Sequence, residues 1–507
     1  MQILGLIEVP NWLVYTTLGT VAFYIYGMWP YSYWKKRGIN GPRMLPLIGD
    51  LPSFMRLGFH GKMVEDLKLY GKVHGTYTLR SPVLVIGDTE MIKQVCIKRA
   101  ENFTDRGSLG NETKPLDKGI AVLKGHEWKR IRSILSPTFS SGKIKAMFPL
   151  VEQCSDQLCT ALVKSSNESV DIKTFFTNFT MDVVASTLFG LQINTQDDPN
   201  NDFKRHGSEL FNIKLFSWKF LSLMLFPKIA IPLFKRFEIT LFPKESFDFF
   251  QKVIHDALVE REASADSDKY HDFLASMVVA RREAEKEGAK GLTEHEVMAQ
   301  SLTFFLAGFE TTANAMQYLA YFLAWNKDCQ DRAYREVLEA KANHGGQVNY
   351  ECLKSLRYLN NCFEESMRLC PPALLTDRVC TETTTVNGYE IEKGINVRIP
   401  IYCLAHDPEV WEEPERFNPD RFDEDSAESR DPTYLIPFGL GPRNCIGMRL
   451  AQMEVRKAMA EMLLKVEFQT LPETLPFEKL EFKPSGFLTV KSPIKLKVVP
   501  RSSESSD

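Results

Sequence analysis

The longest regular pattern in the chain is helical and runs from Thr293 to about Trp325. Glu296 follows Thr293 by three residues, the spacing of a capping box, in which each side chain binds the backbone N–H of the other residue. The segment contains no proline, and at about 1.5 Å per residue it predicts a helix of roughly 45–50 Å. A helix of that length with an apolar middle has to cross the interior of the domain.

Strand-like patterns are short by comparison. β-branched residues and alternation predict four strands, over residues 73–79, 83–87, 383–388 and 397–400. No alternation of strands with helices indicates a dinucleotide-binding unit, and no glycine-rich phosphate loop is present. The predicted fold class is therefore mainly α with small β-sheets.

The amino-terminal segment is apolar throughout. Between Glu8 and Lys35 lie 26 residues without a charge, and about 20 apolar residues suffice to cross a bilayer as a helix. Aromatic residues lie toward both ends of the run, and Lys35, Lys36 and Arg37 follow it, so the positive-inside tendency places the rest of the chain in the cytosol. A cleaved signal peptide is the alternative, but the basic residues follow the run and no cleavage site stands out.

Two further segments carry information about organisation. Residues 41–49 contain two prolines and two glycines, which cannot continue a helix and predict a stiff connector. Residues 211–250 are apolar but interrupted by lysines and Arg236. This second region is interpreted either as core packing or as an amphipathic surface that dips into the membrane and roofs a hydrophobic pocket.

Composition narrows the class of protein. The chain has 507 residues, of which 44% are hydrophobic and 25% charged, with a net charge of −3, so no overall field attracts nucleic acid. Its length suggests about three domains. The ten cysteines include no Cys-x-x-Cys pair, which argues against a disulfide scaffold and a structural zinc site.

One cysteine stands apart from the others. Cys445 lies in a loop with three glycines, at 439, 441 and 447, and a helical pattern begins directly after it at Met448. A thiolate there would receive backbone N–H groups and the positive end of a helix dipole, which lower its pKa. A buried thiolate below a planar cofactor is the axial ligand of an oxygen-activating haem.

These residues resemble the haem-binding signature of the cytochromes P450, and other motifs agree in order and spacing along nearly the whole chain. The matching segments are Trp128 with Arg132, residues 307–312 (Ala-Gly-Phe-Glu-Thr-Thr), Glu365 with Arg368, residues 419–422 (Pro-Asp-Arg-Phe) and residues 437–448. Asp420 stands where the family pattern has Glu. Residues 135–139 and 437–448 resemble family 3 and its clan relatives. The resemblance implies the P450 fold, a helix-rich triangular prism, behind a membrane anchor.

The resemblance assigns roles to individual residues. Cys445 would be the proximal ligand of haem b, and Phe438 would pack on the ligand loop and shield the thiolate. Arginines offer bidentate geometry to carboxylates, so the candidates for binding the haem propionates are Arg106, Trp128, Arg132, Arg378 and Arg443. Glu365 and Arg368 would form a buried structural network with Arg421.

The catalytic prediction is Glu310 with Thr311. In this hypothesis the helix is locally disturbed beside Gly308, Thr311 takes part in oxygen activation and Glu310 relays protons. Taken alone, a helical Glu-Thr-Thr segment is more often a polar surface; the family motif favours the functional interpretation.

The predicted domains are an anchor (1–34), a basic, proline-rich hinge (35–50), a haem-thiolate catalytic domain (51–500) and a polar tail (501–507). The predicted function is insertion of one oxygen atom from O₂ into a lipophilic substrate such as a xenobiotic, steroid or fatty acid. Electrons would come from NADPH through NADPH–cytochrome P450 reductase, with cytochrome b5 as a further partner. The predicted location is the endoplasmic reticulum membrane, single-pass, with the catalytic domain facing the cytosol.

The resemblance and the charge pattern also predict two surfaces. A basic patch of Lys129, Arg130, Arg443 and Lys457 would bind an acidic reductase. The substrate pocket would be lined by residues 107–125, 211–242 and 371–377, which are apolar.

Two rival functions remain open. Some clan relatives rearrange lipid peroxides as isomerases or dehydratases without external electrons, and they often lack the acid–alcohol pair that Glu310 and Thr311 would form. A non-catalytic haem-binding or membrane protein is the other alternative, which an altered ligand loop would have favoured.

Overall fold

The computed structural model describes residues 2–3, 7–8, 10–78, 80–107, 114–198, 200–210, 217–263, 272–286, 288, 290–423 and 430–501. Its helices are α1 (Asn11–Met28), α2 (Tyr33–Lys36), α3 (Leu51–Tyr70), α4 (Thr89–Lys93), α5 (Gly125–Leu135), α6 (Ser141–Lys164), α7 (Ile172–Phe189), α8 (Asp202–Leu210), α9 (Trp218–Leu225), α10 (Pro227–Arg236), α11 (Lys244–Ala263), α12 (Phe273–Lys286), α13 (Glu294–Trp325), α14 (Lys327–Asn343), α15 (Tyr350–Ser355), α16 (Arg357–Leu369), α17 (Ile401–Ala405) and α19 (Met448–Lys465).

The strands are short, as the sequence predicts. They are β1 (Gln2–Ile3), β2 (Ile7–Glu8), β3 (Val73–Thr78), β4 (Ser81–Ile86), β5 (Ser169–Asp171), β6 (Thr376–Val379), β7 (Thr384–Val386), β8 (Tyr389–Ile391), β9 (Asn396–Ile399), β10 (Val466–Gln469) and β11 (Lys495–Pro500). The largest sheet has the order β3-β4-β9-β6, with β4 and β9 parallel. The predicted fold class, mainly helical with small sheets, is confirmed.

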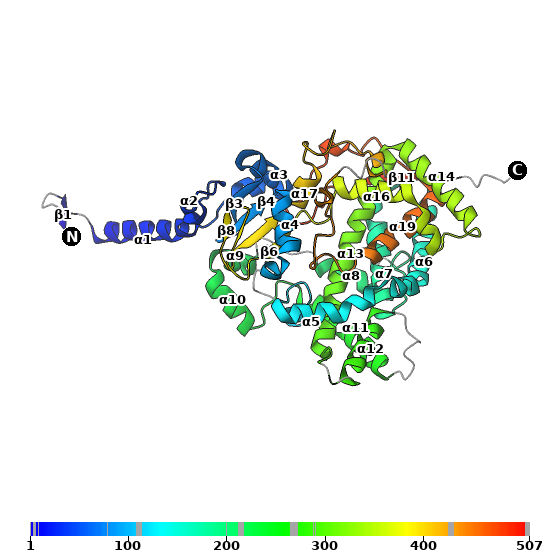
Figure 1. The fold of residues 1–507 in the computed structure, drawn as a ribbon, viewed down its shortest axis with the longest axis horizontal. Helices are drawn as coiled ribbons and strands as arrows, with labels where there is room; N and C mark the ends of the chain where they lie inside the picture. Colours follow the sequence, from blue (N-terminus) through cyan, green and yellow to red (C-terminus); the bar gives the residue numbers. More distant parts are fainter. Residues whose placement is uncertain are drawn as a thin grey trace.

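Helix α13 is the central element of the molecule, and it crosses the body between α7, α16 and α19 (Figure 1). It begins with the predicted capping box, in which the Thr293 hydroxyl accepts from Glu296 N and the Glu296 carboxylate accepts from Thr293 N. Tyr318 is fully buried and donates from its hydroxyl to the carbonyl of Leu488 at 2.9 Å. Residues in the first half of the helix form part of the wall of two large cavities in the body.

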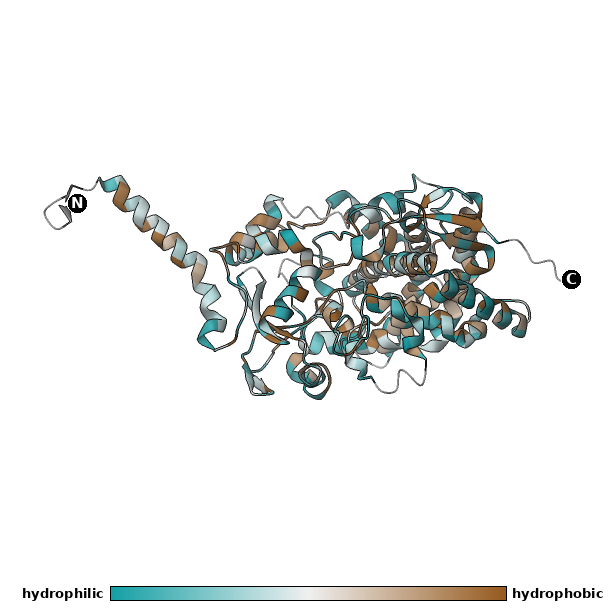
Figure 2. Ribbon diagram, turned by 90° about the horizontal axis from the view of Figure 1, so that it is seen from above, coloured by the Kyte–Doolittle hydropathy of each residue, from teal (hydrophilic) through white to brown (hydrophobic). Residues whose placement is uncertain are grey.

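The amino-terminal helix α1 projects from the body (Figures 1 and 2) and exposes several large apolar side chains, among them Trp12, Tyr15 and Phe23. Within the described residues, no helix has both the length and the apolar character needed to cross a membrane. The membrane-spanning helix predicted within residues 1–34 is therefore not found. Helix α1 has 18 residues and includes three threonines.

Residues 211–250 form α9, α10 and the start of α11, with residues 211–216 outside the described chain. Leu223, Ala230 and Phe234 make a small core of their own, while Trp218 and Ile229 are exposed. Local core packing is thus confirmed, and the membrane-facing interpretation stays a prediction for the exposed apolar side chains.

Candidate haem-thiolate site

The loop before α19 is shaped by two glycines in the left-handed region. Gly439 has φ +77° and Gly441 has φ +75°, a conformation that side chains disfavour. A Cβ on Gly441 would lie 1.9 Å from the carbonyl oxygen of Cys96, so only glycine fits. The amide of Cys445 then donates to the carbonyl of Phe438 at 2.8 Å, which closes the loop. Phe438 packs against the main core.

Cys445 is the one cysteine with a large accessible surface among the ten, all of which lie in the described chain. That surface belongs to an internal cavity of about 370 Å³, which Cys445 lines together with Phe438. Burial raises the pKa of the Cys445 thiol, although the N–H of Gly447 and the charges of Arg106 and Arg132 act to lower it. The loop and the helix thus act to lower the pKa of the free thiol, as expected, but the opposite effect of burial is larger. Binding to a metal ion deprotonates a thiol outright.

Helix α13 supplies another wall of the same cavity through Ala307, Gly308 and Thr311. The Thr311 hydroxyl donates to the carbonyl of Ala307 at 2.7 Å. The helix is continuous across this segment, so the predicted local disturbance beside Gly308 is not seen. Instead, the Thr311 hydroxyl is satisfied by the backbone carbonyl of Ala307, one turn earlier in the same helix.

Glu310 does not line the cavity. Its carboxylate accepts from the ammonium of Lys173, at the start of α7, and from the Asn314 amide at 3.5 Å. Because consecutive helical residues point in different directions, Thr311 reaches the cavity while Glu310 contacts α7. The structure therefore places the alcohol, but not the acid, at the cavity.

Three guanidinium groups line the cavity, on Arg106, Arg132 and Arg443. No carboxylate of the described chain lies within ion-pair distance of any of them. Arg443 donates to the carbonyls of residues 104, 120 and 123, and its guanidinium lies 4.0 Å from the Trp128 ring centroid. Burial and the neighbouring arginines lower the pKa of Arg443. The cluster is thus a concentration of positive charge that no carboxylate of the described residues pairs with.

The remaining contacts connect this cluster to the ligand loop. Arg132 donates to the carbonyl of Asn444 at 3.1 Å and to its side-chain oxygen at 2.9 Å. Arg106 donates to the carbonyl of Arg443 at 2.7 Å, and its Nε is buried with no hydrogen-bond partner among the described residues. Arg378 is buried, donates to the carbonyl of Leu440 at 2.9 Å and does not itself line the cavity.

These residues fit a haem. The donor set of Cys445 and an orphaned buried Nε, with surplus guanidinium charge, matches a group that carries both a metal and carboxylates. Cys445 would bind the iron, and Arg106, Trp128, Arg132 and Arg443 would face the propionates. Haem supplies iron that activates O₂.

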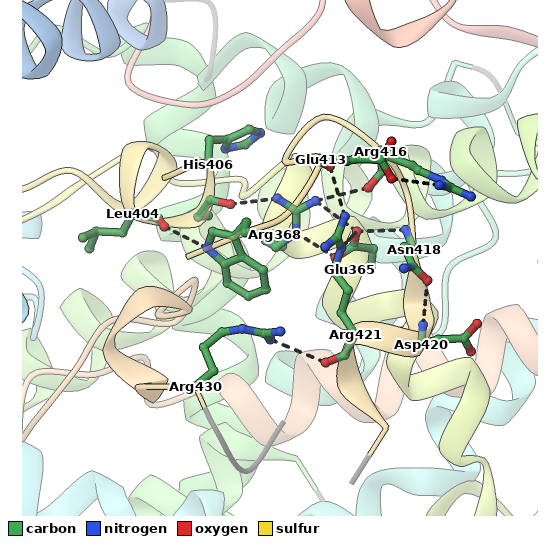
Figure 3. A network of polar contacts seen from close by, with 12 residues as sticks. Glu365, Arg368, Leu404, His406, Glu413, Arg416, Asn418, Asp420, Arg421 and Arg430 are labelled. Atoms are coloured by element: carbon green, nitrogen blue, oxygen red, sulfur yellow. Dashed lines mark hydrogen bonds and ion pairs between the residues drawn. The ribbon is translucent and has the colours of Figure 1, made fainter. Parts of the chain in front are cut away.

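A second arginine cluster lies around Glu365 (Figure 3). Arg368 and Glu365 are fully buried and joined at 2.7 and 3.0 Å, and Arg421 donates to Glu365 at 3.3 Å. This confirms the predicted network with Arg421. The sequence motifs did not indicate that Asn418 N also donates to Glu365, at 2.9 Å, or that Trp411 lies beside Arg368.

The chain matches the family Cytochrome P450 over residues 39–498. The chain is a cytochrome P450. It is 37% identical to cytochrome P450 3A56 of Fundulus heteroclitus over 94% of this chain and 96% of that protein. It is 36% identical to cytochrome P450 3A2 of Rattus norvegicus over 99% of both chains, and 35% identical to cytochrome P450 3A27 of Oncorhynchus mykiss over 100% of this chain and 98% of the other.

Membership of this family confirms the predicted haem-thiolate cofactor and the predicted activity. This P450 is a monooxygenase that inserts one atom of O₂ into a lipophilic substrate. The predicted resemblance to family 3 is confirmed as well, since each of these three relatives carries the designation 3A.

The predicted basic patch for a reductase is wrong for two of its four residues. Arg443 is buried in the site, and Lys457 is buried between the carboxylates of Glu152 and Glu461. Arg130 is neutralised by Glu127 and Glu296. Only Lys129 is exposed as expected.

Proposed function

We propose that this P450 oxidises lipophilic substrates through a site in which Cys445 binds the haem iron and Thr311 faces the reacting centre. The observation that carries the assignment is the meeting at one cavity of Cys445, Thr311 and three guanidiniums, none of which is paired with a carboxylate of the described residues. In this proposal Arg106, Trp128, Arg132 and Arg443 bind the propionates, and Phe438 shields the thiolate. Arg378 acts by holding the ligand loop at Leu440.

Proton delivery is assigned to Thr311 at the cavity and to Glu310 behind it. Thr311 holds its proton in the hydrogen bond to the Ala307 carbonyl, and it can turn to donate into the cavity. Glu310 reaches the site only by leaving Lys173, to which it is hydrogen-bonded. The two residues therefore act in sequence, with Lys173 fixing the resting position of the acid.

The substrate enters from a second, larger cavity of about 900 Å³, which shares the lining residues Ala121, Thr303 and Ala307 with the haem cavity. Residues of the predicted regions line both spaces, including Leu116, Val122, Phe220, Leu241, Phe242, Ala373 and Leu375; residues 108–113 and 211–216 lie outside the described chain. Exposed Ile48, Met55 and Phe487 also line the larger cavity, so an apolar ligand can reach it without crossing a polar shell.

The remaining predictions concern location and partners. We propose that the protein lies on the endoplasmic reticulum membrane with its catalytic body in the cytosol, attached by the exposed apolar side chains of α1 and of α9–α10. NADPH–cytochrome P450 reductase would deliver the electrons, with cytochrome b5 as a second donor, and neither partner binds through the buried Arg443 or Lys457.

Replacement of the proposed ligand tests the assignment. We expect Cys445→Ser to abolish the thiolate-type absorption band of the reduced carbon monoxide complex and the oxidation of all substrates. Cys329→Ser is the matched control, because that cysteine lies outside the cavity; it should leave both unchanged. An unchanged spectrum in Cys445→Ser would exclude this residue as the ligand.

A further inference from the structure

The larger cavity is mostly apolar, and among its described lining residues one cation has no carboxylate within ion-pair distance. Its charged lining residues are Asp50, Lys62, Asp66 and Arg398, and His74 lines it as well. Lys62 is bound by both carboxylates, at 2.9 Å to Asp50 and 2.7 Å to Asp66. Burial lowers the pKa of His74, which favours a neutral ring.

Arg398 differs from Lys62 in its partners. It lies on β9, opposite Asp377 of β6 and Val85 of β4. Its guanidinium donates to the hydroxyl of Thr78 at 2.6 Å. No carboxylate of the described chain lies within ion-pair distance, because Asp377 is taken up by the amide of Asn396 at 2.8 Å and Asp50 by Lys62.

The surroundings of Arg398 make this charge costly. Its Nε is buried and has no hydrogen-bond partner among the described residues, and its guanidinium lies 5.6 Å from the Phe59 ring centroid. The Arg398 side chain is half-buried. Its accessible part faces the cavity that it lines, and protein encloses the rest. A buried guanidinium without an anion is unfavourable, and it gains most from a carboxylate that it can bind through two parallel hydrogen bonds.

We propose that Arg398 binds the carboxylate of an amphipathic substrate, such as a fatty acid, whose apolar chain lies along the cavity toward Ala307. Thr303 and Ala307 line both cavities, so a chain held at Arg398 can extend toward the side of α13 that also carries Thr311. This inference rests on the proposed function, because it names a substrate class for the same site. It also predicts oxidation toward the methyl end of the chain rather than next to the carboxylate.

Binding to the holoenzyme separates the charge contribution from the apolar contribution. We would measure the affinities of dodecanoate and of methyl dodecanoate by isothermal titration calorimetry. For the unmodified enzyme we expect dodecanoate to bind at least tenfold more tightly than its ester. In Arg398→Met this ratio should fall close to one through weaker binding of the acid, with the ester unaffected. Arg398→Gln, which can keep the hydrogen bond to Thr78, provides a second uncharged variant should Arg398→Met fold poorly.

Arg99→Met is the matched control, since Arg99 is exposed and donates to Thr384 and Thr385 outside the cavity; it should keep the full ratio. A ratio near one in the unmodified enzyme, or an unchanged ratio in both Arg398 variants, would overturn the inference. The proposed function is tested separately, by oxidation of neutral lipophilic substrates with reductase and NADPH. Its failure would leave the calorimetric ratio intact, whereas failure of the present inference would leave that oxidation intact.

Discussion

This P450 has two arginine clusters, and they differ in one respect. In the cluster of Glu365, Arg368 and Arg421, the carboxylate accepts from both guanidiniums and from a backbone amide. In the cluster of Arg106, Arg132 and Arg443, the guanidiniums donate to carbonyl and amide oxygens, and within the described residues none of them pairs with a carboxylate. The first cluster is complete within the chain. The second has the composition of a binding site for an anionic group.

The comparison teaches how to separate a structural from a cofactor-binding arginine. Burial of a single arginine does not distinguish the clusters, since Arg368 of one and Arg443 of the other are both buried. The balance of charge does, because a buried cation is maintained only where an opposite charge is supplied. Arg398 in the outer cavity follows the same rule.

The largest expected effect is on the complete cluster. Glu365→Ala would leave Arg368 and Arg421 buried without their anion, and loss of one partner of a buried pair costs about 3–5 kcal/mol. Urea unfolding followed by circular dichroism measures this loss. Arg416→Ala is the control, because Arg416 forms only an exposed pair with Glu413, and its loss should cost less than about 1 kcal/mol. Equal effects of both changes would refute the structural role of Glu365.

The second cluster should respond in haem retention rather than in stability. We expect Arg132→Gln to speed the transfer of haem to an acceptor protein by about tenfold, a difference of about 1.4 kcal/mol, with unfolding of the haem-free protein changed by less than about 0.5 kcal/mol. Arg132→Lys keeps the charge but not the paired contacts with Asn444. Its rate of haem transfer should therefore lie between the rates of the unmodified protein and of Arg132→Gln. If Arg132→Gln lost stability and retained haem normally, this cluster would be structural and would not bind the cofactor.

A buried acid at the haem cavity offers a pH test. Burial raises the pKa of Glu454 to about 8, and Glu454 lines the cavity. In the unfolded chain this carboxyl ionises near its ordinary pKa of about 4.3. Between these two values the folded protein binds the extra proton, so stability falls as the pH rises, by at most about 1.4 kcal/mol per pH unit from this group.

Glu454→Gln removes that dependence. Compared with the unmodified protein, the variant should gain stability between pH 5 and pH 8, as measured by urea unfolding at each pH. Exposed Glu473→Gln should show no such gain. If the difference in unfolding free energy between Glu454→Gln and the unmodified protein did not change with pH, Glu454 would be ionised in the folded protein.

The smallest effect concerns the edge of the complete cluster. The guanidinium of Arg430 lies 4.0 Å from the Trp411 ring centroid and donates to the Arg421 carbonyl at 3.5 Å. Arg430→Ala should cost about 0.5–1 kcal/mol, the contribution of a cation–π contact at a partly exposed site. Arg430→Lys should recover part of this in thermal unfolding. A loss as large as that of Glu365→Ala would mean that Arg430 belongs to the inner network.

The sequence predicted those features that depend on local spacing. The capping box of Thr293 and Glu296, the loop that presents Cys445 and the pair of Glu365 with Arg368 each lie within a few residues, so backbone geometry determines them. Features that depend on distant segments could not be predicted this way. The pairing of Glu310 with Lys173 joins residues 137 apart, and the burial of Lys457 depends on Glu152 of another helix.

The contacts of the Cys445 loop have a consequence for biosynthesis. Arg443 and Asn444 bond to residues 312–339 positions earlier in the chain. These contacts can form only after residues 443 and 444 have left the ribosome, when about seven-eighths of the polypeptide has emerged. Until then, the earlier cations and Thr311 have no thiolate opposite them. Capture of haem is therefore a late event in synthesis, and a nascent chain cut short before Cys445 should not retain the cofactor.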